Sequence, residues 1–352
     1  MPFGLETQYP NLYILIVAAP GKCRKGPTVG LAKRMLSDLQ LPVFVDSPTK
    51  RALTKFMHKI SDTSHFEYAG KSMVQSPPIL ISKELSSFFA VDPKSMIEVL
   101  TDLYDFHADK WEYETSGEGK DTILCPCVNC LFATTPRWMA ANLPEDAIGG
   151  GFTSRFVLVG AESKYKSVSL PPPINEGLYR DLLLDLGQIS KLVGLFKWGE
   201  GALELYDEWY ESVDSIVKKI KDERLHGNVY RMHTIAIKVA MSLSCSASSD
   251  LVITPEKMEQ SITLLTDALR NAHLALGAHG RSKTGIDTDR IIRNLRDLYP
   301  GSISFKELLR YNYLNTNKEE LNTVLEDCRA MGLVTSKLVG EEMHFKYKKG
   351  EK

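Results

Sequence analysis

The sequence has no surplus of charge, little cysteine, and no apolar run long enough to cross a membrane. Its 43 basic and 44 acidic residues leave a net charge of -1, and only six of its 352 residues are cysteine. The first residues lack the basic stretch and apolar run of a secretory signal. The longest apolar run, Leu12–Ala19, falls well short of the roughly 20 residues that span a bilayer. We therefore expect a cytoplasmic protein with reduced thiols and no membrane partner.

The near-neutral charge also narrows the kinds of nucleic-acid binding that we expect. A protein that coats duplex DNA as a monomer is usually more basic. A ring or filament can instead gather a few basic loops from each subunit into one positive channel. The chain is 43% hydrophobic and 25% charged, as is usual for a soluble globular protein, and has no repeat of fixed period. Its length suggests two or three domains.

The first half of the chain alternates short β-rich runs with helical stretches. Five runs are predicted to be strands: 12–17, 41–45, 79–82, 127–134 and 155–159. The first is continuously apolar, as in a strand buried on both faces of a parallel sheet, and helical spacing follows from Thr28 to Leu39. Strands that alternate with helices predict an α/β fold with right-handed crossovers.

The pattern changes after this core. The stiff stretch Pro171–Pro173 leads into residues 175–280, where apolar residues at helical spacing predict a bundle of four or five helices. A polar break at Gly280–Gly285 precedes three short helical segments and two alternating runs, 333–337 and 343–347. Three helices and a β-hairpin are typical of a winged helix. The predicted domains are therefore an α/β core at 1–165, a helical domain at 166–280 that would lie over it as a lid, and a winged helix at 281–352.

The first candidate site joins the first predicted strand to the helix after it. Backbone N–H groups at a helix N-terminus can cradle a phosphate, and a lysine there can reach the β and γ phosphates. The candidate phosphate-binding residues are Gly21, Lys22, Arg24, Lys25, Gly26 and Thr28, with Lys25 first among the lysines. A standard loop has glycine before the lysine and a hydroxyl residue after it, but Arg24 and Gly26 stand there, which leaves Thr28 to hold magnesium. An ordinary basic turn is the alternative.

The second candidate site is the end of the third predicted strand. An acidic residue there can polarise the water that attacks a γ-phosphate, and Glu84 has this place. The residue before it, where an aspartate usually helps to hold magnesium, is Lys83. The alternative is that Glu84 is a solvated glutamate at a helix start.

Two further candidate segments follow along the chain. The fourth predicted strand ends in the hydroxyls of Thr134 and Thr135, which can orient an attacking water. Three glycines, 149–151, then precede Arg155 at the start of the fifth strand. An arginine there can reach the nucleotide of a neighbouring subunit and stabilise charge in the transition state. The alternative for Arg155 is a surface salt bridge.

These segments resemble a family of P-loop proteins found in phage, plasmid and integrated-element replication modules, often fused to a primase. The resemblance spans residues 10–270 and is carried by Pro10–Tyr13, Leu80–Leu85, Thr134–Trp138, Asn142–Phe152 and Leu205–Tyr210. Ser154–Phe156, before an apolar strand, is similar to the arginine-finger motif of minichromosome-maintenance-type AAA+ helicases.

The resemblance implies an ATPase that uses ATP and Mg²⁺, assembles into a ring, expected to be a hexamer, and moves on single-stranded or forked DNA, with a primase as a further partner. It also implies that an arginine in the helical lid contacts the γ-phosphate. Arg231 is the candidate, with a salt bridge inside the lid as the alternative. Gly26 and Lys83 depart from the family pattern at both magnesium-holding positions, so the sequence also allows a protein that binds ATP without hydrolysing it.

Two other patterns carry less weight. Cys125, Cys127 and Cys130 lie close together, but no second pair of cysteines or histidines completes a zinc site, and a buried strand explains them better. The third helix of the predicted winged helix is too acidic to read bases convincingly. Basic residues gather on the wing and tail instead, where they can contact phosphate or a partner: Lys337, Lys346, Lys348 and Lys349.

The leading hypothesis is therefore an ATP-driven DNA helicase or translocase with ATP bound between subunits. One rival is a subunit that binds or loads DNA and keeps the ATPase fold without turnover. Another is a nucleotide-regulated switch in defence or transcription control, with the winged helix as its DNA reader.

Overall fold

The chain forms two compact units, Met1–Gly277 and Ala278–Lys352. The computed structural model describes residues 1–45, 49–105, 110–115, 119–144, 146–148, 150–164, 166–276, 283–299 and 301–348. Four parts of the segments named above lie outside the described residues: Glu145, Gly149, residues 280–282 and Lys349. The predicted core and the predicted lid both fall within the first unit. None of the described helices is long and apolar enough to cross a membrane.

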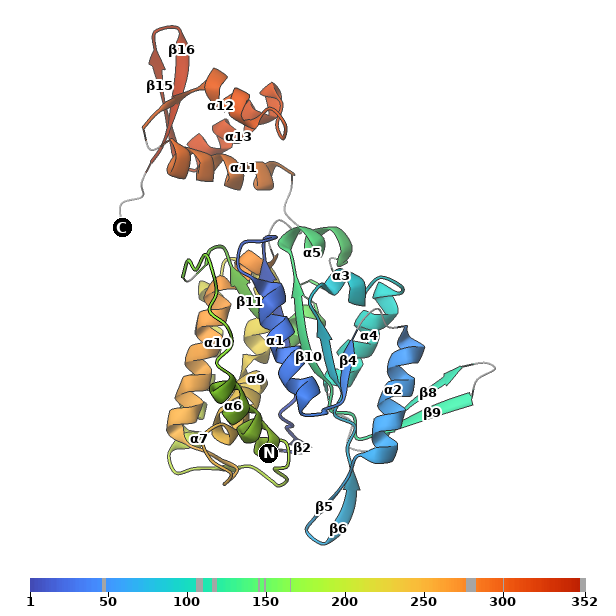
Figure 1. The fold of residues 1–352 in the computed structure, drawn as a ribbon. Coiled ribbons are helices and arrows are strands. Elements are labelled where there is room, and N and C mark those ends of the chain that lie inside the picture. Colours follow the sequence, from blue (N-terminus) through green and yellow to red (C-terminus); the bar gives the residue numbers. More distant parts are fainter. Residues whose placement is uncertain are drawn as a thin grey trace. The chain divides into compact units, whose positions relative to one another are not determined.

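A five-stranded parallel sheet is the centre of the first unit (Figure 1). In spatial order its strands are β11 (Phe156–Ala161), β3 (Tyr13–Ala18), β10 (Asn129–Thr134), β7 (Ile79–Ser82) and β4 (Val43–Val45). The α/β class with a parallel sheet is therefore confirmed. The strand that comes first along the chain, β3, lies between the last two, β10 and β11, and pairs in register with both.

Helices cover the two faces of this sheet unequally. α1 (Lys25–Asp38) covers one face, where Val29 packs on Ile81 and Ala133. The other face is packed by α2 (Lys50–Thr63), α3 (Leu85–Phe88), α4 (Pro93–Tyr104) and α5 (Pro136–Asn142). Tyr13 and Phe132 point into this larger core and are fully buried. Because successive strand residues face opposite sides, both faces need apolar side chains, which explains the continuous apolar runs.

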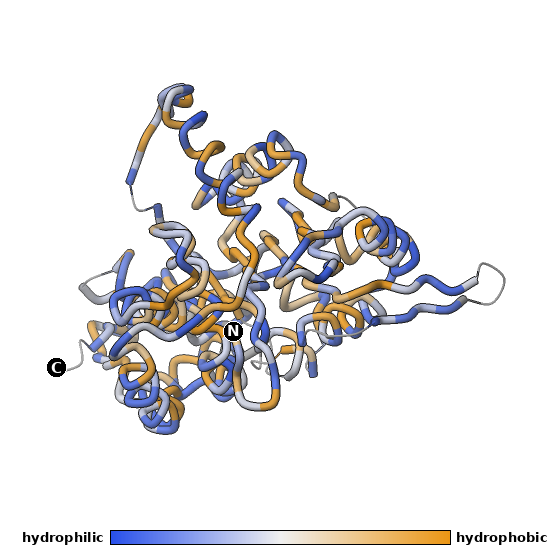
Figure 2. The backbone as a smooth tube through the Cα atoms, turned by 90° about the horizontal axis from the view of Figure 1, so that it is seen from below, coloured by the Kyte–Doolittle hydropathy of each residue, from blue (hydrophilic) through white to orange (hydrophobic). Residues whose placement is uncertain are grey.

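Antiparallel hairpins are inserted between the alternating strands and helices in the described part of the first unit. They were not predicted from the sequence. They are β5 (His65–Tyr68) with β6 (Lys71–Val74), and β8 (Lys110–Thr115) with β9 (Gly119–Leu124). At the base of the second hairpin, Ile123 and Trp111 pack on the larger core. Its outer part is hydrophilic (Figure 2). A further short pair, β1 (Pro2–Phe3) and β2 (Glu6–Thr7), lies at the N-terminus.

Helices of the predicted lid pack against the sheet and against each other. Within residues 166–276 they are α6 (Glu176–Ile189), α7 (Ala202–Glu211), α8 (Val213–Lys219), α9 (His226–Cys245) and α10 (Pro255–Leu276). The 3₁₀ turn η2 (Glu223–Leu225) precedes α9, and the short strands β12 (Lys197–Trp198) and β13 (Val252–Ile253) pair in parallel. α10 lies so close to β11 that a Cβ at Gly160 would stand 2.3 Å from the Asn271 carbonyl oxygen. α6 is tied to α1 by the Tyr179 hydroxyl, which donates to Asp38 at 2.7 Å.

The second unit combines helices with a three-stranded antiparallel sheet. Its elements are α11 (Lys283–Arg293), the π-helical turn η3 (Asn294–Leu298), β14 (Ile303–Ser304), α12 (Phe305–Asn312), α13 (Lys318–Ala330), β15 (Val334–Val339) and β16 (Glu342–Tyr347). β16 lies between β14 and β15 in the sheet. Capping boxes, with Ser304 and Asn317 as N-caps, begin α12 and α13. Leu308, Leu321 and Phe345 belong to a core of its own.

Candidate functional site

The carboxyl ends of β3 and β10 form a topological switch point. The chain leaves β3 through α1 on one face of the sheet and leaves β10 through α5 on the other face. Adjacent parallel strands whose connections diverge in this way leave a crevice beyond their carboxyl ends, where open α/β sheets bind ligands. The predicted phosphate loop and Thr134 therefore lie at the edge of the sheet where a ligand is expected.

The loop after β3 has the backbone geometry of a tight, anchored turn. Gly21 has a φ of 69° and Arg24, the N-cap of α1, has a φ of 53°, so both are in the left-handed region. The Arg24 guanidinium donates to the Val168 carbonyl at 2.5 Å, and the Cys23 thiol lies 3.5 Å from the Ser163 carbonyl. The stretch after β11 thus fixes the loop. Lys22 is exposed, and Arg24 is engaged away from the helix end.

Lys25 is the first residue of α1 and is only 8% exposed. Among the described residues, none forms a hydrogen bond or ion pair with its ammonium. The first turn of α1 contains no acidic residue, and no side chain caps it. The free backbone N–H groups of a helix N-terminus carry partial positive charge, and the ammonium of Lys25 adds a full positive charge beside them. Both attract an anion to this place.

The residues that were expected to hold magnesium do not offer oxygen ligands toward the loop. Gly26 has no side chain, and a Cβ built on it meets nothing within 4 Å. Thr28 is exposed, and its hydroxyl donates to the Arg24 carbonyl at 3.2 Å within the helix. Lys83 offers an ammonium where an aspartate would stand. Mg²⁺ demands oxygen ligands in near-octahedral geometry, so these residues do not fit the ion.

The end of β7 places Glu84 on the surface of the same sheet edge. Glu84 is the N-cap of α3 and is exposed, and its backbone carbonyl accepts a hydrogen bond from the Ser82 hydroxyl at 2.7 Å. Its carboxylate makes no capping bond to α3. Lys83 is also exposed, and its side chain runs beside Gly30 of α1.

The two threonines at the end of β10 have different surroundings. Thr134 is the last residue of the strand, pairs in register with Val17 of β3, and is 1% exposed. Thr135 is the N-cap of α5, and its hydroxyl accepts from the Trp138 backbone N–H at 3.2 Å. Thr135 therefore has a structural task that accounts for its hydroxyl, whereas Thr134 lies beside the phosphate loop.

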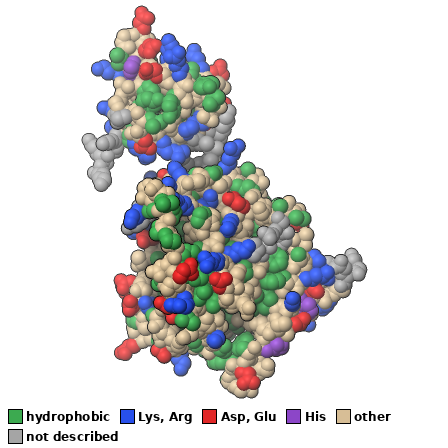
Figure 3. All heavy atoms as spheres, in the orientation of Figure 1, with side chains coloured by type: hydrophobic (Ala, Val, Ile, Leu, Met, Phe, Trp, Pro, Cys, Tyr) green, Lys and Arg blue, Asp and Glu red, His purple; other side chains and the backbone are tan. Residues whose placement is uncertain are grey.

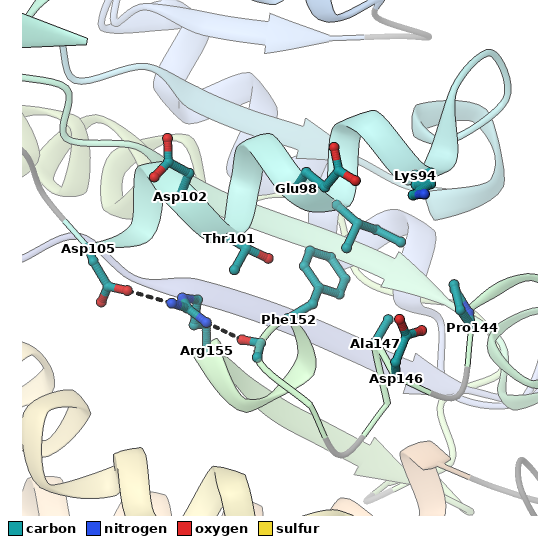
Figure 4. A pocket seen from close by; sticks show the side chains of 12 residues that line it. Lys94, Glu98, Thr101, Asp102, Asp105, Pro144, Asp146, Ala147, Phe152 and Arg155 are labelled. Atoms are coloured by element: carbon teal, nitrogen blue, oxygen red, sulfur yellow. Dashed lines mark hydrogen bonds and ion pairs between the residues drawn. The ribbon is translucent and has the colours of Figure 1, made fainter.

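The two predicted arginines lie together at the opposite edge of the sheet. Arg155 pairs with Asp105 at 2.5 Å and also donates to the Gly151 carbonyl, as Figure 4 shows. Arg231 of α9 lies 3.7 Å from the other oxygen of the same carboxylate. The Nε of Arg155 is buried and has no partner among the described residues. Two guanidinium groups thus share one carboxylate, which is 58% exposed.

Arg155 borders a cavity of about 680 Å³ between α4 and the segment before β11. Thr101 and Phe152 line its middle, and Glu98 and Asp146 lie toward the end away from Arg155 (Figure 4). Burial first, and then the nearby Arg155 charge, lower the pKa of Arg231 below its ordinary value. The end of the cavity near Arg155 combines its guanidinium with the carboxylates of Asp102 and Asp105.

One chain cannot bring its own arginine pair to its own phosphate loop without refolding. Phe156, next to Arg155, pairs with Tyr13 at the start of β3, whereas the phosphate loop begins after Ala18. Five residues of extended strand separate these ends, or about 16 Å at a rise of roughly 3.3 Å per residue. Lys25, Thr134 and Glu84 thus belong to one edge of the sheet, and Arg155 and Arg231 belong to the other.

Sequence reasoning missed a buried polar cluster beside the arginine pair. Lys238 of α9 is 3% exposed, donates to the Asn11 side chain at 2.7 Å, and lies 4.2 Å from the centre of the Tyr104 ring. Burial lowers the pKa of Lys238 to about 8. The lysine stands within an apolar stretch of a helix, and that was the only local signal. Its partner Asn11 is 227 residues away in the sequence.

Cys127 and Cys130 are buried thiols. Burial raises the pKa of the Cys127 thiol to about 12, and the pKa of Cys130 is also raised by burial. Among the described residues, no cluster of three or more histidine, cysteine, aspartate or glutamate side chains is arranged to hold a metal ion. Thiols in such surroundings pack as small apolar groups.

Comparison with known proteins gives likenesses to solved structures and no family. No family model and no curated protein match the sequence. Solved structures that resemble the chain include a full-length MCM homolog from Methanopyrus kandleri, with 15% sequence identity and a TM-score of 0.39. The match covers 74% of this chain and 51% of that one, so the chain spans about half the length of the homolog.

Proposed function

We propose that this chain is the ATP-binding subunit of a ring-forming DNA motor of the AAA+ helicase type. The observation that carries the proposal is Lys25, a residue only 8% exposed whose ammonium has no partner among the described residues, at the N-terminus of α1 and at the switch point of the sheet. A triphosphate is the ligand that suits this place, because the loop, the helix N-terminus and the lysine are all complementary to negative charge.

The arrangement of charged residues favours a site shared between subunits. Lys25 and Glu84 lie at one edge of the sheet, while Arg155 and Arg231 lie at the other. A head-to-tail contact between identical subunits brings these different surfaces together, and such a contact closes into a ring when its rotation permits. In that ring the arginine pair of one subunit faces the phosphates held by the next, and we propose a hexamer.

The residues suggest how the nucleotide would be hydrolysed. A water molecule attacks the γ-phosphorus, the bond from that phosphorus to the β–γ bridging oxygen breaks, and ADP and phosphate leave. Glu84 accepts the proton of the attacking water, and Thr134 orients that water. Arg155 of the neighbouring subunit stabilises negative charge on the transferred group. No step is assigned to Mg²⁺, because Gly26 and Lys83 do not supply ligands for it.

The second unit is proposed to be a winged helix that contacts DNA. Its element order places three helices before the hairpin β15–β16, and β14 completes a three-stranded sheet with that hairpin. Lys337 lies on β15 and Lys346 lies on β16, and they suit phosphate contact rather than base reading. Acidic and basic side chains are interspersed on the face of the first unit shown in Figure 3. We therefore expect DNA to be held by several subunits together.

A non-hydrolysing subunit is the second candidate. Gly26 and Lys83 favour it, because the hydroxyl and the carboxylate that would hold a metal are both replaced. Such a subunit would bind ATP to assemble on single-stranded or forked DNA and would not turn it over. A role in a mobile-element or phage replication module, with a primase as partner, remains a prediction from the sequence.

ATP hydrolysis by the purified chain, with and without single-stranded DNA, tests the proposal and separates the two candidates. The motor requires DNA-stimulated phosphate release that Lys25→Met abolishes. Arg155→Lys should also abolish it, and mixing the two inactive variants should restore part of the activity, because some mixed interfaces contain both native residues. ATP binding without phosphate release would favour the second candidate. DNA-stimulated hydrolysis that neither variant changes would refute the assignment of this site.

A further inference from the structure

The side chain of Lys83 lies against the face of α1 that carries the magnesium-holding position. A Cβ built on Gly30 would stand 3.0 Å from both the Cε and the Nζ of Lys83. Gly26 and Gly30 are four residues apart, so they lie on the same face of α1, one turn from each other. The ammonium of Lys83 is thus held beside the first turns of the helix whose N-terminus faces the proposed phosphates.

The distance between this ammonium and position 26 can be bounded. Nothing lies within 4 Å of a Cβ built on Gly26, so the Nζ of Lys83 is farther away than that. Cβ atoms four residues apart on a helix are about 5–6 Å apart, so the Nζ lies within about 9 Å of that position. A phosphate oxygen, or the metal ion that usually binds one, fits a gap of this size.

Gly30 is part of the same arrangement. Any larger residue there would put its Cβ at 3.0 Å from the end of the Lys83 side chain and would push the ammonium away from α1. Gly30 itself lowers helix stability relative to alanine. Its absent side chain leaves the room that the lysine uses.

We infer that the ammonium of Lys83 takes the place of the magnesium ion and that the site binds a metal-free nucleoside triphosphate. This inference rests on the proposed function. Lys25 contacts the phosphates from the helix N-terminus, and Lys83 approaches them from the end of β7. A free triphosphate carries more negative charge than its magnesium complex, so two lysines and a helix N-terminus complement it better. A divalent cation beside Lys83 would be repelled by the ammonium.

The first test is the affinity of the full chain for ATP, measured by isothermal titration calorimetry in EDTA and again with excess Mg²⁺. The inference predicts that binding in EDTA is at least as tight as binding with Mg²⁺. Lys83→Met should weaken binding in EDTA about ten-fold or more, as expected for the loss of a hydrogen bond to a charged group. Lys71→Met is the matched control, because Lys71 is an exposed lysine on the β5–β6 hairpin, and it should leave the affinity unchanged.

The second test rebuilds a magnesium site. The double variant Gly26→Ser, Lys83→Asp supplies a hydroxyl and a carboxylate at the two altered positions, and the open space around Gly26 accepts the new side chain. This variant should bind ATP weakly in EDTA and recover affinity when Mg²⁺ is added. Native folding is checked by tryptophan fluorescence, since Trp111, Trp138, Trp198 and Trp209 all lie in the first unit.

The outcomes separate this inference from the proposed function. If the wild-type chain binds ATP only with Mg²⁺, and Lys25→Met abolishes that binding, the proposed site stands and the role of Lys83 is refuted. Equal affinities of wild type and Lys83→Met in EDTA would refute it as well. No ATP binding under either condition would overturn the proposed function, and the inference with it.

Discussion

Burial of Lys238 should make the stability of the first unit depend on pH in the alkaline range. The ordinary pKa of lysine is 10.5, and burial lowers it to about 8 in the folded chain. Below pH 8 the lysine is charged in both the folded and the unfolded states, and burying the charge costs stability. Between pH 8 and 10.5 the folded chain releases the proton while the unfolded chain keeps it, so the free energy of unfolding rises with pH.

The size of this effect follows from the difference of about 2.5 pKa units. At about 1.36 kcal/mol per unit, the full change is on the order of 3 kcal/mol. Asp105 and Cys127 raise the pKa of Lys238, and Arg231 and Arg155 lower it, but each contributes less than burial. The hydrogen bond to Asn11 and the contact with Tyr104 hold the lysine in place.

The assay is denaturant unfolding of wild type and Lys238→Met at pH 7 and pH 10, followed by tryptophan fluorescence, which reports the first unit alone. Lys238→Met removes the titrating group and leaves the Asn11 oxygen without its donor, a loss that does not depend on pH. Relative to this variant, the wild-type chain should gain about 2–3 kcal/mol between pH 7 and pH 10. Lys71→Met should follow the wild type. Parallel pH profiles for wild type and Lys238→Met would refute the reasoning.

Three further predictions concern packing and capping. Gly160→Ala should lower the free energy of unfolding by about 1–3 kcal/mol or more, because the new Cβ would meet the Asn271 backbone between β11 and α10. Denaturant unfolding measures this change, and an unchanged unfolding midpoint would contradict the close contact. Asn228→Ala should cost roughly 1–3 kcal/mol in the same assay, since its amide donates to the Thr153 and Phe156 carbonyls at 2.9 and 3.2 Å. Thr135→Ala should cost about 1 kcal/mol by removing the N-cap of α5 without abolishing ATP binding. Loss of ATP binding in a folded Thr135→Ala variant would show that its hydroxyl acts on the nucleotide.

The parallel sheet could be predicted because its strands stand out in the sequence as apolar runs. A strand buried on both faces is a nearly continuous apolar run; β3 and β11 are such runs, and β7 is one up to Ser82. The hairpin β5–β6 has no such signal, since its strands are four residues each and mostly exposed. β8–β9 was missed for a related reason, because only its base is buried against the core.

The start of α1 shows how local sequence misleads. Helical spacing was noted only from Thr28 onward, yet α1 begins at Lys25 and includes Gly26 and Pro27 in its first turn. The first N–H groups of a helix have no partner inside it, so a proline in the first turn costs nothing there. The turn is made by Arg24, whose backbone is in the left-handed region. No residue pattern predicts that a residue other than glycine will adopt that conformation.

The individual residues of the candidate site could be predicted from the sequence, but the contacts between them in space could not. Lys25, Glu84 and Thr134 follow strands that end at the same edge of the sheet, and parallel topology alone brings them together. Arg155 was assigned to a neighbouring subunit from its resemblance, but its pairing with Asp105, which Arg231 shares, could not be foreseen. Those contacts join segments 50 and more residues apart, and only the folded chain sets them side by side.

The measurement that tests the central claim most directly is the affinity of the wild-type chain and of Lys25→Met for ATP, by calorimetry on the full-length protein. The proposed site depends on Lys25, whose ammonium has no partner among the described residues. We predict that wild type binds one ATP per subunit and that Lys25→Met, folded as judged by tryptophan fluorescence, binds at least about ten-fold more weakly. Equal affinities would show that ATP binds elsewhere, and no binding by the wild-type chain would contradict the account.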